Sequence, residues 1–194
     1  MKHKTLIKNP LFQHLRAFPG TLFFVLLLLV FTNPNESIIY DFVFLLISNL
    51  TNPFIFKPLS RILYAMFGVK DPPIIGRGIR PDGASCCGEF YDCDDLRKNK
   101  LSTSFGMPSG HSQCAWIFSS YFIYLLSQNK KTNNYVKTFQ CLVLVIFACL
   151  MAYSRVYVEG CHTIQQVIVG AFIGTIIGIT GGYFKTKYFK NKVF

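Results

Sequence analysis

Long stretches of apolar residues with almost no charge constrain the fold of this chain more than any other feature. The clearest stretches cover residues 18–31, 138–153 and 164–184. A helix needs about 20 predominantly apolar residues to cross the hydrocarbon core of a bilayer. Because 51% of the residues are hydrophobic and only 15% are charged, a disordered chain, a coiled coil and a soluble globule are all disfavoured. We therefore expect an all-α, polytopic membrane bundle.

The apolar stretches divide into six expected transmembrane helices. The first resembles a signal peptide, because basic residues precede it, but no cleavage site of small residues follows, so an uncleaved span is favoured. The stretch 38–68 is too long for one transmembrane span and short for two spans. Asn52-Pro53 interrupts this stretch, which predicts two short helices. The expected helices cover residues 15–31, 37–51, 54–69, 110–127, 136–153 and 163–184.

The basic residues set the expected sidedness. Lysines and arginines without acidic neighbours lie before the first span and after the last, which the positive-inside rule places in the cytoplasm. Six spans with both ends inside put Lys57, Arg61 and most other basic residues on that side, and all 9 acidic residues on the other. The net charge of +11 then reflects topology, and no nucleic-acid partner is expected. The expected parts are a cytoplasmic segment 1–16, one membrane domain 17–184 with a non-cytoplasmic loop 69–107, and a basic cytoplasmic tail 185–194.

Three polar stretches at one membrane face hold the candidate functional residues. These stretches are residues 76–81, 108–112 and 154–162. The forked guanidinium groups of Arg80 and Arg155 suit phosphate oxygens. A helix that begins after Ser109 exposes N–H groups that bind anions. His111 and His162 can serve as acid and nucleophile at neutral pH, so the set predicts phosphoryl transfer without a metal ion.

The same stretches resemble the three signature motifs of the type 2 phosphatidic acid phosphatase (PAP2) family, whose superfamily includes the vanadium haloperoxidases. The family motifs are Lys-x6-Arg-Pro, Pro-Ser-Gly-His and Ser-Arg-x5-His-x3-Asp, and the resemblance covers roughly residues 37–184. It implies a six-span bundle that needs no cofactor. It also implies that His162 forms a phosphohistidine and that His111 protonates the leaving oxygen and then activates water. Phosphate oxygens would be held by Arg80, Arg155, Ser109 and the N–H of Gly110.

The chain departs from these motifs in three places. Pro73 stands where the first motif has lysine, and Lys70 or Arg77 are the candidates to supply that charge. Six residues, instead of five, separate Arg155 from His162, which predicts a bulged turn within 156–161. Gln166 replaces the aspartate that orients the nucleophilic imidazole, and its carbonyl oxygen can accept the same N–H bond. The glutamine resembles the dolichyl diphosphate phosphatase and glucose-6-phosphatase branches.

Four of the seven cysteines are expected on the non-cytoplasmic side, namely Cys86, Cys87, Cys93 and Cys161. If that side is oxidising, a disulfide within the loop is favoured, from Cys86 or Cys87 to Cys93. A zinc site is the rival interpretation, but adjacent cysteines do not have the usual spacing of zinc ligands, so no metal is expected. Cys161 is interpreted as structural.

These features predict an integral membrane phosphatase that hydrolyses a phosphomonoester or pyrophosphate on a lipid, such as phosphatidic acid or a polyprenyl (dolichyl) diphosphate. The alternatives are a lipid headgroup phosphotransferase of the same superfamily and a catalytically inactive homologue. The active site is expected on the lumenal or extracellular side. Lys190 and Lys192 resemble a dilysine signal for the endoplasmic reticulum, although a positive-inside tail explains them equally well. The sequence leaves the oligomeric state open.

Overall fold

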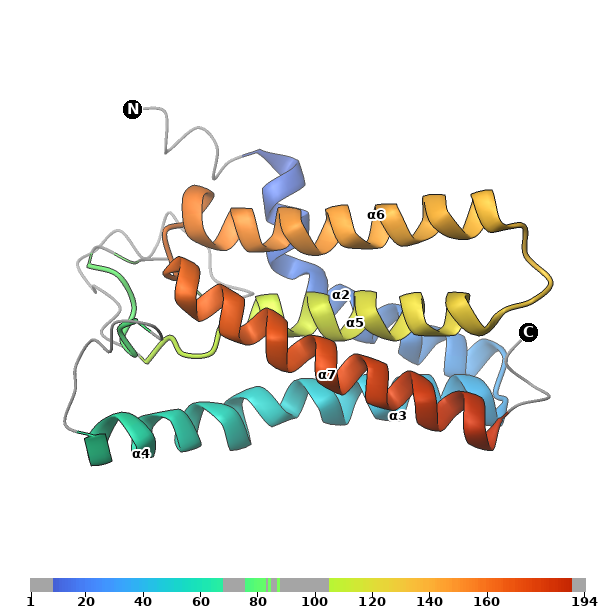
Figure 1. The fold of residues 1–194 in the computed structure, drawn as a ribbon, viewed down its shortest axis with the longest axis horizontal. Helices are drawn as coiled ribbons and strands as arrows, with labels where there is room; N and C mark the ends of the chain where they lie inside the picture. The colour runs from blue at the N-terminus through green and yellow to red at the C-terminus, as the bar shows by residue number, and fades with distance from the viewer. Residues whose placement is uncertain (1–8, 68–75, 83, 85–86, 88–104, 190–194) are drawn as a thin grey trace.

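The computed structural model describes residues 9–67, 76–82, 84, 87 and 105–189. The described helices run lengthwise and are joined at the two ends of a bundle (Figure 1). This arrangement confirms the all-α class. The helical segments are α2 (Pro10–Thr32), α3 (Glu36–Thr51), η1 (Asn52–Phe56), α4 (Lys57–Phe67), α5 (Gly110–Gln128), α6 (Asn134–Tyr153), η3 (Ser154–Val158) and α7 (Ile164–Tyr188).

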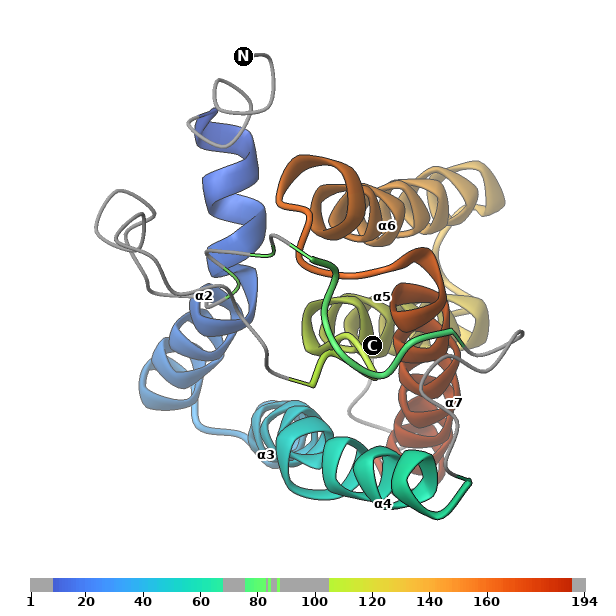
Figure 2. The same ribbon diagram turned by 90° about the vertical axis from the view of Figure 1, so that its left-hand side faces the viewer.

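Four helical runs in the described part of the chain are long and apolar enough to cross a membrane, namely 10–32, 36–66, 134–158 and 164–188. Helix α5 is less apolar and lies among the other helices (Figure 2). Its buried hydroxyl groups are paired, since Ser112 Oγ donates to Val167 O at 2.8 Å and Ser119 Oγ donates to Leu144 O at 3.0 Å. Polar residues are tolerated in α5 because protein, rather than lipid, surrounds it.

Residues 36–67 form one continuous helical run, and the expected division into two short helices does not occur. The π-helical turn η1 joins α3 to α4 and holds Pro53 in its first turn. An i→i+5 turn accommodates a proline, because the chain is widened where the missing N–H would interrupt an α-helix. The described bundle therefore has five lengthwise runs, where the sequence predicted six.

The continuous run changes which residues share an end of the bundle. Helix α4 lies at the same end as residues 76–82, and Tyr64 Oη donates to Gly76 O at 2.6 Å (Figure 1). The expected placement of Lys57 and Arg61 at the opposite face is therefore wrong. Helix α2 begins at this end and α7 finishes at the other, so the first and last helices do not start and finish on one face.

Helices α5 and α7 approach closely along a row of glycines in α7. A Cβ atom at Gly170 would lie 2.6 Å from Ser109 O, and one at Gly174 would lie 2.5 Å from Gln113 O. Small residues allow such close helix packing in membrane proteins. The row fixes the start of α7 against the start of α5, where the candidate site residues lie.

A largely buried ion pair joins α3 to α7 at the end of the bundle away from residues 76–82. Lys185 Nζ lies 2.6 Å from both carboxylate oxygens of Asp41, and Tyr121 Oη of α5 donates to the same carboxylate. The Lys185 and Asp41 side chains are only 6% and 15% exposed. Removal of one partner would leave the other charge poorly solvated.

Replacing Lys185 with methionine should lower the free energy of unfolding by roughly 3 kcal/mol, because breaking a buried pair leaves an uncompensated charge. Thermal or denaturant unfolding in detergent would measure the change. Lys187→Met is the matched control, since Lys187 contacts the rings of Tyr183 and Tyr188 near the same helix end. Equal midpoints for the two variants would contradict the prediction.

Candidate active site

Residues from the three predicted stretches meet at one end of the bundle. The chain around Gly78 pairs with the segment before α5, because Gly106 N donates to Gly78 O at 2.8 Å and Ile79 forms a β-bridge with Phe105. Gly78 is required there, since an added Cβ would lie 2.4 Å from the Phe105 ring. The backbone N–H of Ser109 donates to the backbone carbonyl oxygen of Gln166 at 3.0 Å. These backbone bonds hold all three stretches together.

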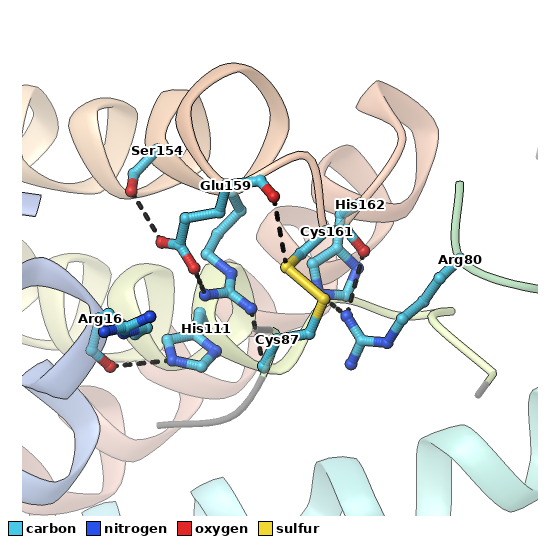
Figure 3. Close-up of polar contacts among 9 residues, drawn as sticks. Arg16, Arg80, Cys87, His111, Ser154, Glu159, Cys161 and His162 are labelled. Atoms are coloured by element: carbon cyan, nitrogen blue, oxygen red, sulfur yellow. Dashed lines mark hydrogen bonds and ion pairs between the residues drawn. A yellow bond between two sulfur atoms is a disulfide. The ribbon is translucent and has the colours of Figure 1, made fainter. Parts of the chain in front are cut away.

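The hydrogen bonds of His162 define its tautomer. His162 Nε2 lies 3.1 Å from Arg80 Nη1 (Figure 3). On the other side of the ring, His162 Nδ1 lies 3.0 Å from Gln166 Oε1. A guanidinium nitrogen only donates, so Nε2 must accept, and the ring proton of a neutral imidazole is on Nδ1. The lone pair of Nε2 therefore faces Arg80, the side on which a bound anion would lie.

The side chain of Gln166 is held by four groups and has one possible orientation. Its Nε2 donates to Arg77 O and to Ile79 O, both at 2.8 Å, which places Oε1 toward His162. Thr163 N also donates to Oε1 at 3.3 Å, while Gln166 N donates to Thr163 Oγ1, which completes a capping box at the start of α7. The amide of Gln166 therefore connects the first motif stretch to the imidazole of His162, and it is fully buried.

Arg155 is fully buried and has an acidic partner that the sequence analysis did not single out. Its Nη1 donates to Glu159 Oε2, and its Nη2 donates to Cys87 O at 3.1 Å. Glu159 Oε1 in turn accepts from Ser154 Oγ at 2.9 Å (Figure 3). The i,i+4 spacing of Arg155 and Glu159 was the available signal for this pair.

The extra residue before His162 is accommodated in a π-helical turn. In η3, Glu159 N donates to Ser154 O at 2.9 Å, an i→i+5 bond. The predicted bulge is therefore present, and it begins two residues earlier than expected. His162 N and Cys161 N both donate to Arg155 O, at 3.2 and 3.0 Å, which keeps the arginine and the histidine in one turn.

Cys87 and Cys161 form a disulfide, with Cα atoms 5.6 Å apart. The predicted pairing of Cys87 with Cys93 is therefore wrong, and Cys86 and Cys93 lie outside the described residues. The bond joins two segments that are 74 residues apart, which sequence spacing could not indicate. It fixes the backbone next to His162, where Cys161 O accepts from Arg80 Nη1 at 3.0 Å.

His111 and Ser109 lie at the beginning of α5. His111 Nε2 lies 3.0 Å from Arg16 O of α2, and since a carbonyl only accepts, this ring nitrogen carries a proton. The other ring nitrogen is turned away from Arg16, toward Cys87 (Figure 3). Ser109 Oγ is buried and has no hydrogen-bond partner in the described structure, so it can donate to a bound oxyanion. Gly110 lets Asn52 approach, because a Cβ there would lie 3.2 Å from Asn52 Oδ1.

Neither candidate for the missing first-motif cation is placed in this cluster. Lys70 lies outside the described residues. The Arg77 guanidinium pairs with the exposed carboxylate of Asp82 at 3.1 Å, while its backbone carbonyl binds Gln166. Arg77 therefore contributes its backbone, and not its charge, to the cluster.

A pocket of about 350 Å³ opens between the motif residues and helices α2 and α3. Its polar wall includes Arg80, Gly110, His111, His162 and Lys57. Its apolar wall includes Pro19, Phe23, Leu46 and Leu50. The sequence analysis missed Lys57, although a lysine inside an apolar stretch is by itself a signal of function.

The cations around His162 change its acidity. Burial, together with the charges of Arg155 and Arg80, holds the pKa of His162 well below its ordinary value of 6.5. Burial and the charge of Arg155 likewise lower the pKa of Arg80 to about 10, so its guanidinium remains charged at neutral pH. His162 is therefore neutral at pH 7, with Nε2 unprotonated. Among the described residues, no cluster of three or more His, Cys, Asp or Glu side chains could hold a metal ion.

Arg80→Gln should raise the pKa of His162, because one of the cations that disfavour its protonated form is removed. If His162 must be neutral to react, activity is lost as the pH falls through its pKa, so the acidic limb of kcat/KM should move to higher pH. Profiles on one substrate would be compared with Arg77→Gln, whose guanidinium pairs with Asp82. An acidic limb that stays in place in Arg80→Gln would contradict the assignment.

The Arg-Pro, Pro-Ser-Gly-His and Ser-Arg…His segments thus converge at one end of a bundle of apolar helices, as the family resemblance implied. The chain belongs to the PAP2 superfamily, whose family model matches residues 54–190. This match confirms the resemblance that the motifs indicated.

Curated relatives support the same class. The chain is 38% identical to dolichyldiphosphatase 1 of Rhinolophus ferrumequinum and of Homo sapiens over 86 residues, which are 41% of this chain and 36% of each relative. It is 35% identical to dolichyldiphosphatase 1 of Dictyostelium discoideum over 86 residues, or 43% of this chain and 35% of that protein. The alignments thus span about a third of the relatives' length. No solved structure matches the chain.

Proposed function

We propose that this protein is a metal-independent lipid phosphatase that acts through a phosphohistidine on His162, with a polyprenyl diphosphate as the favoured substrate. The observation that carries the proposal is the imidazole of His162, whose Nδ1–H is fixed by Gln166 and whose Nε2 lies beside Arg80 in the pocket. The fixed tautomer leaves the lone pair of Nε2 as the nucleophile, and it exchanges its bond from Arg80 for the bond to phosphorus.

The reaction proceeds in two displacements. Nε2 of His162 attacks phosphorus and forms an N–P bond, while the bond from phosphorus to the leaving oxygen breaks. That oxygen takes a proton from the pocket-facing Nδ1 of His111, which reacts as the imidazolium and keeps its Nε2–H on Arg16 O. His111 then removes a proton from water, whose oxygen attacks phosphorus, and the N–P bond breaks to release phosphate. The guanidinium of Arg80, the guanidinium of Arg155 and the hydroxyl and N–H groups at the start of α5 stabilise the charge on the phosphoryl oxygens.

The two walls of the pocket support a lipid substrate. Cations and imidazoles line one side, whereas apolar residues of α2 and α3 line the other. A substrate with a charged headgroup and an acyl or isoprenoid tail satisfies both walls at once. The names of the curated relatives favour dolichyl diphosphate among such lipids.

We also propose that the site faces the lumen of the endoplasmic reticulum. The Cys87–Cys161 disulfide suits an oxidising compartment, which supports a lumenal site. In sealed microsomes, a membrane-impermeant reductant should leave this disulfide intact until detergent is added. Reduction in intact vesicles would place the site on the cytoplasmic side.

The activity is tested by phosphate release from phosphatidic acid, diacylglycerol pyrophosphate and dolichyl diphosphate, each with purified protein in detergent and a chelator present. We expect release from at least one lipid, with dolichyl diphosphate preferred. Transfer of the phosphoryl group to an added lipid alcohol instead of water would identify the phosphotransferase. A folded protein that neither releases nor transfers phosphate would be the inactive homologue.

A further inference from the structure

We propose that Lys57 binds a phosphate group of the substrate, so that α4 supplies the cation that the first motif lacks. The inference rests on the proposed phosphatase function, and it assigns to that site a residue outside the three motif stretches. Pro73 occupies the motif position where a lysine is expected, and the Arg77 guanidinium pairs with Asp82. Lys70 lies outside the described residues, so among the residues that the structure describes a third cation of the pocket comes from a different element.

The position of Lys57 suits this role. It begins α4 and lines the same pocket as Arg80, His111 and His162. The neighbouring arginines Arg80, Arg61 and Arg155 all repel its ammonium group. Lys57 is therefore near enough to the motif cations to share an anionic ligand with them.

The charge of Lys57 is not balanced by any acidic side chain in the described part of the chain. Among the described residues, the carboxylate close to the site is that of Glu159, and Arg155 and Ser154 already bind it. An ammonium group held among other cations at the edge of a membrane is costly unless an anion joins it. Phosphate oxygens are the anions for which the rest of this pocket is built.

The backbone around η1 determines the direction of Lys57. In an α-helix, residue i+5 lies about 140° around the helix axis from residue i. In a turn closed by an i→i+5 hydrogen bond, residue i+5 lies nearly on the same side of the axis as residue i. The N–H of Lys57 donates to Asn52 O across this turn, so both residues line the pocket. The extra residue in η1 thus turns Lys57 toward the site.

Hydrogen bonds also fix this turn against α5. Asn52 Nδ2 donates to Gln113 Oε1 at 2.7 Å, and Gln113 Nε2 donates to Thr51 Oγ1 at 3.0 Å. Asn52 is buried beside Gly110, which is the residue that immediately precedes His111. The backbone at Lys57 is therefore held at a constant position relative to the start of α5. A residue that binds a phosphate group on His162 requires such a fixed position.

The test compares Lys57→Met with Lys57→Arg and with Arg61→Met in the full chain. Arg61 is the matched control, because it is a cation one turn further along α4, it is absent from the pocket lining, and its guanidinium lies over the Phe105 ring at 5.6 Å. Equilibrium binding of inorganic phosphate in detergent, measured by calorimetry and by the shift in unfolding temperature, reports on the site without turnover. Phosphate release from dolichyl diphosphate gives kcat/KM in parallel.

We expect Lys57→Met to weaken phosphate binding and to lower kcat/KM by about tenfold or more, because a charge-assisted bond is lost. Lys57→Arg should retain most of the binding, and Arg61→Met should bind as the wild type does. The unfolding temperature of Lys57→Met without phosphate should equal or exceed that of the wild type, since an unbalanced charge is removed, whereas a structural lysine would lower it.

Unchanged phosphate binding in Lys57→Met would overturn the inference, as would equal losses in Lys57→Met and Arg61→Met or a wild type that binds no phosphate. Failure of the proposed phosphatase function would give a different result from failure of the Lys57 inference. A chain that binds phosphate through Lys57 but hydrolyses no lipid keeps the inference and loses the activity.

Discussion

Replacing His162 with alanine should reduce phosphate release by about 10³-fold or more, while leaving the bundle folded. The expectation follows from the hydrogen bonds of the imidazole, since Nδ1–H is held by Gln166 and Nε2 accepts from Arg80 at 3.1 Å. Of the two described histidines that line the pocket, only His162 has its ring nitrogens held by a side-chain amide and a guanidinium, whereas His111 is held by the Arg16 carbonyl. Release of labelled phosphate from dolichyl diphosphate, measured in detergent, gives the rate.

His14→Ala is the matched control for this variant. His14 lies on an exposed part of α2, so its loss should leave the rate unchanged. A covalent intermediate gives a second readout, because acid-labile, base-stable label from a radioactive lipid phosphate should appear on the wild type and on His14→Ala alone. If His162→Ala retains the wild-type rate, the phosphohistidine assignment fails even though the PAP2 fold remains.

The sequence was sufficient for those features that depend on local pattern. Apolar stretches of membrane length predicted the all-α bundle, and the spacing of short motifs predicted that Arg80, His111 and His162 meet at one end. The extra residue before His162 predicted a bulge, which is the π-turn η3. In each case the signal lies within one apolar stretch or one motif, where the chain itself limits the possible geometry.

The features that were missed depend on long-range contacts or on a single hydrogen-bonded turn. Asn52-Pro53 was interpreted as a break between two helices, but a π-turn carries the proline without ending the helix. This one difference joins α3 and α4 into a single run and places Lys57 beside the site. The pairing of Cys87 with Cys161 joins segments 74 residues apart, so spacing within the loop could not indicate it.

Replacing Gln166 with glutamate should lower the rate by about 10²-fold, although a carboxylate at this position is what the family motif contains. The reason is the environment of the amide, whose Nε2 donates to Arg77 O and Ile79 O, both at 2.8 Å. A carboxylate would place an anionic oxygen against these two carbonyl oxygens inside a fully buried site. The carbonyls would lose their donor, and the repulsion would displace the chain that carries Arg80.

The comparison with Gln166→Ala separates geometry from charge. Alanine removes the bond to His162 Nδ1 without introducing repulsion, so the glutamate variant should be at least as impaired as the alanine variant and less stable to heat. Gln165→Glu, at the exposed neighbouring position, controls for an added charge at the start of α7. If Gln166→Glu were faster than the wild type, charge on the orienting group would matter more than the two carbonyl bonds. The rate and unfolding temperature of the three variants, measured in the same detergent, decide between these accounts, because only the amide satisfies the imidazole and the two carbonyls together.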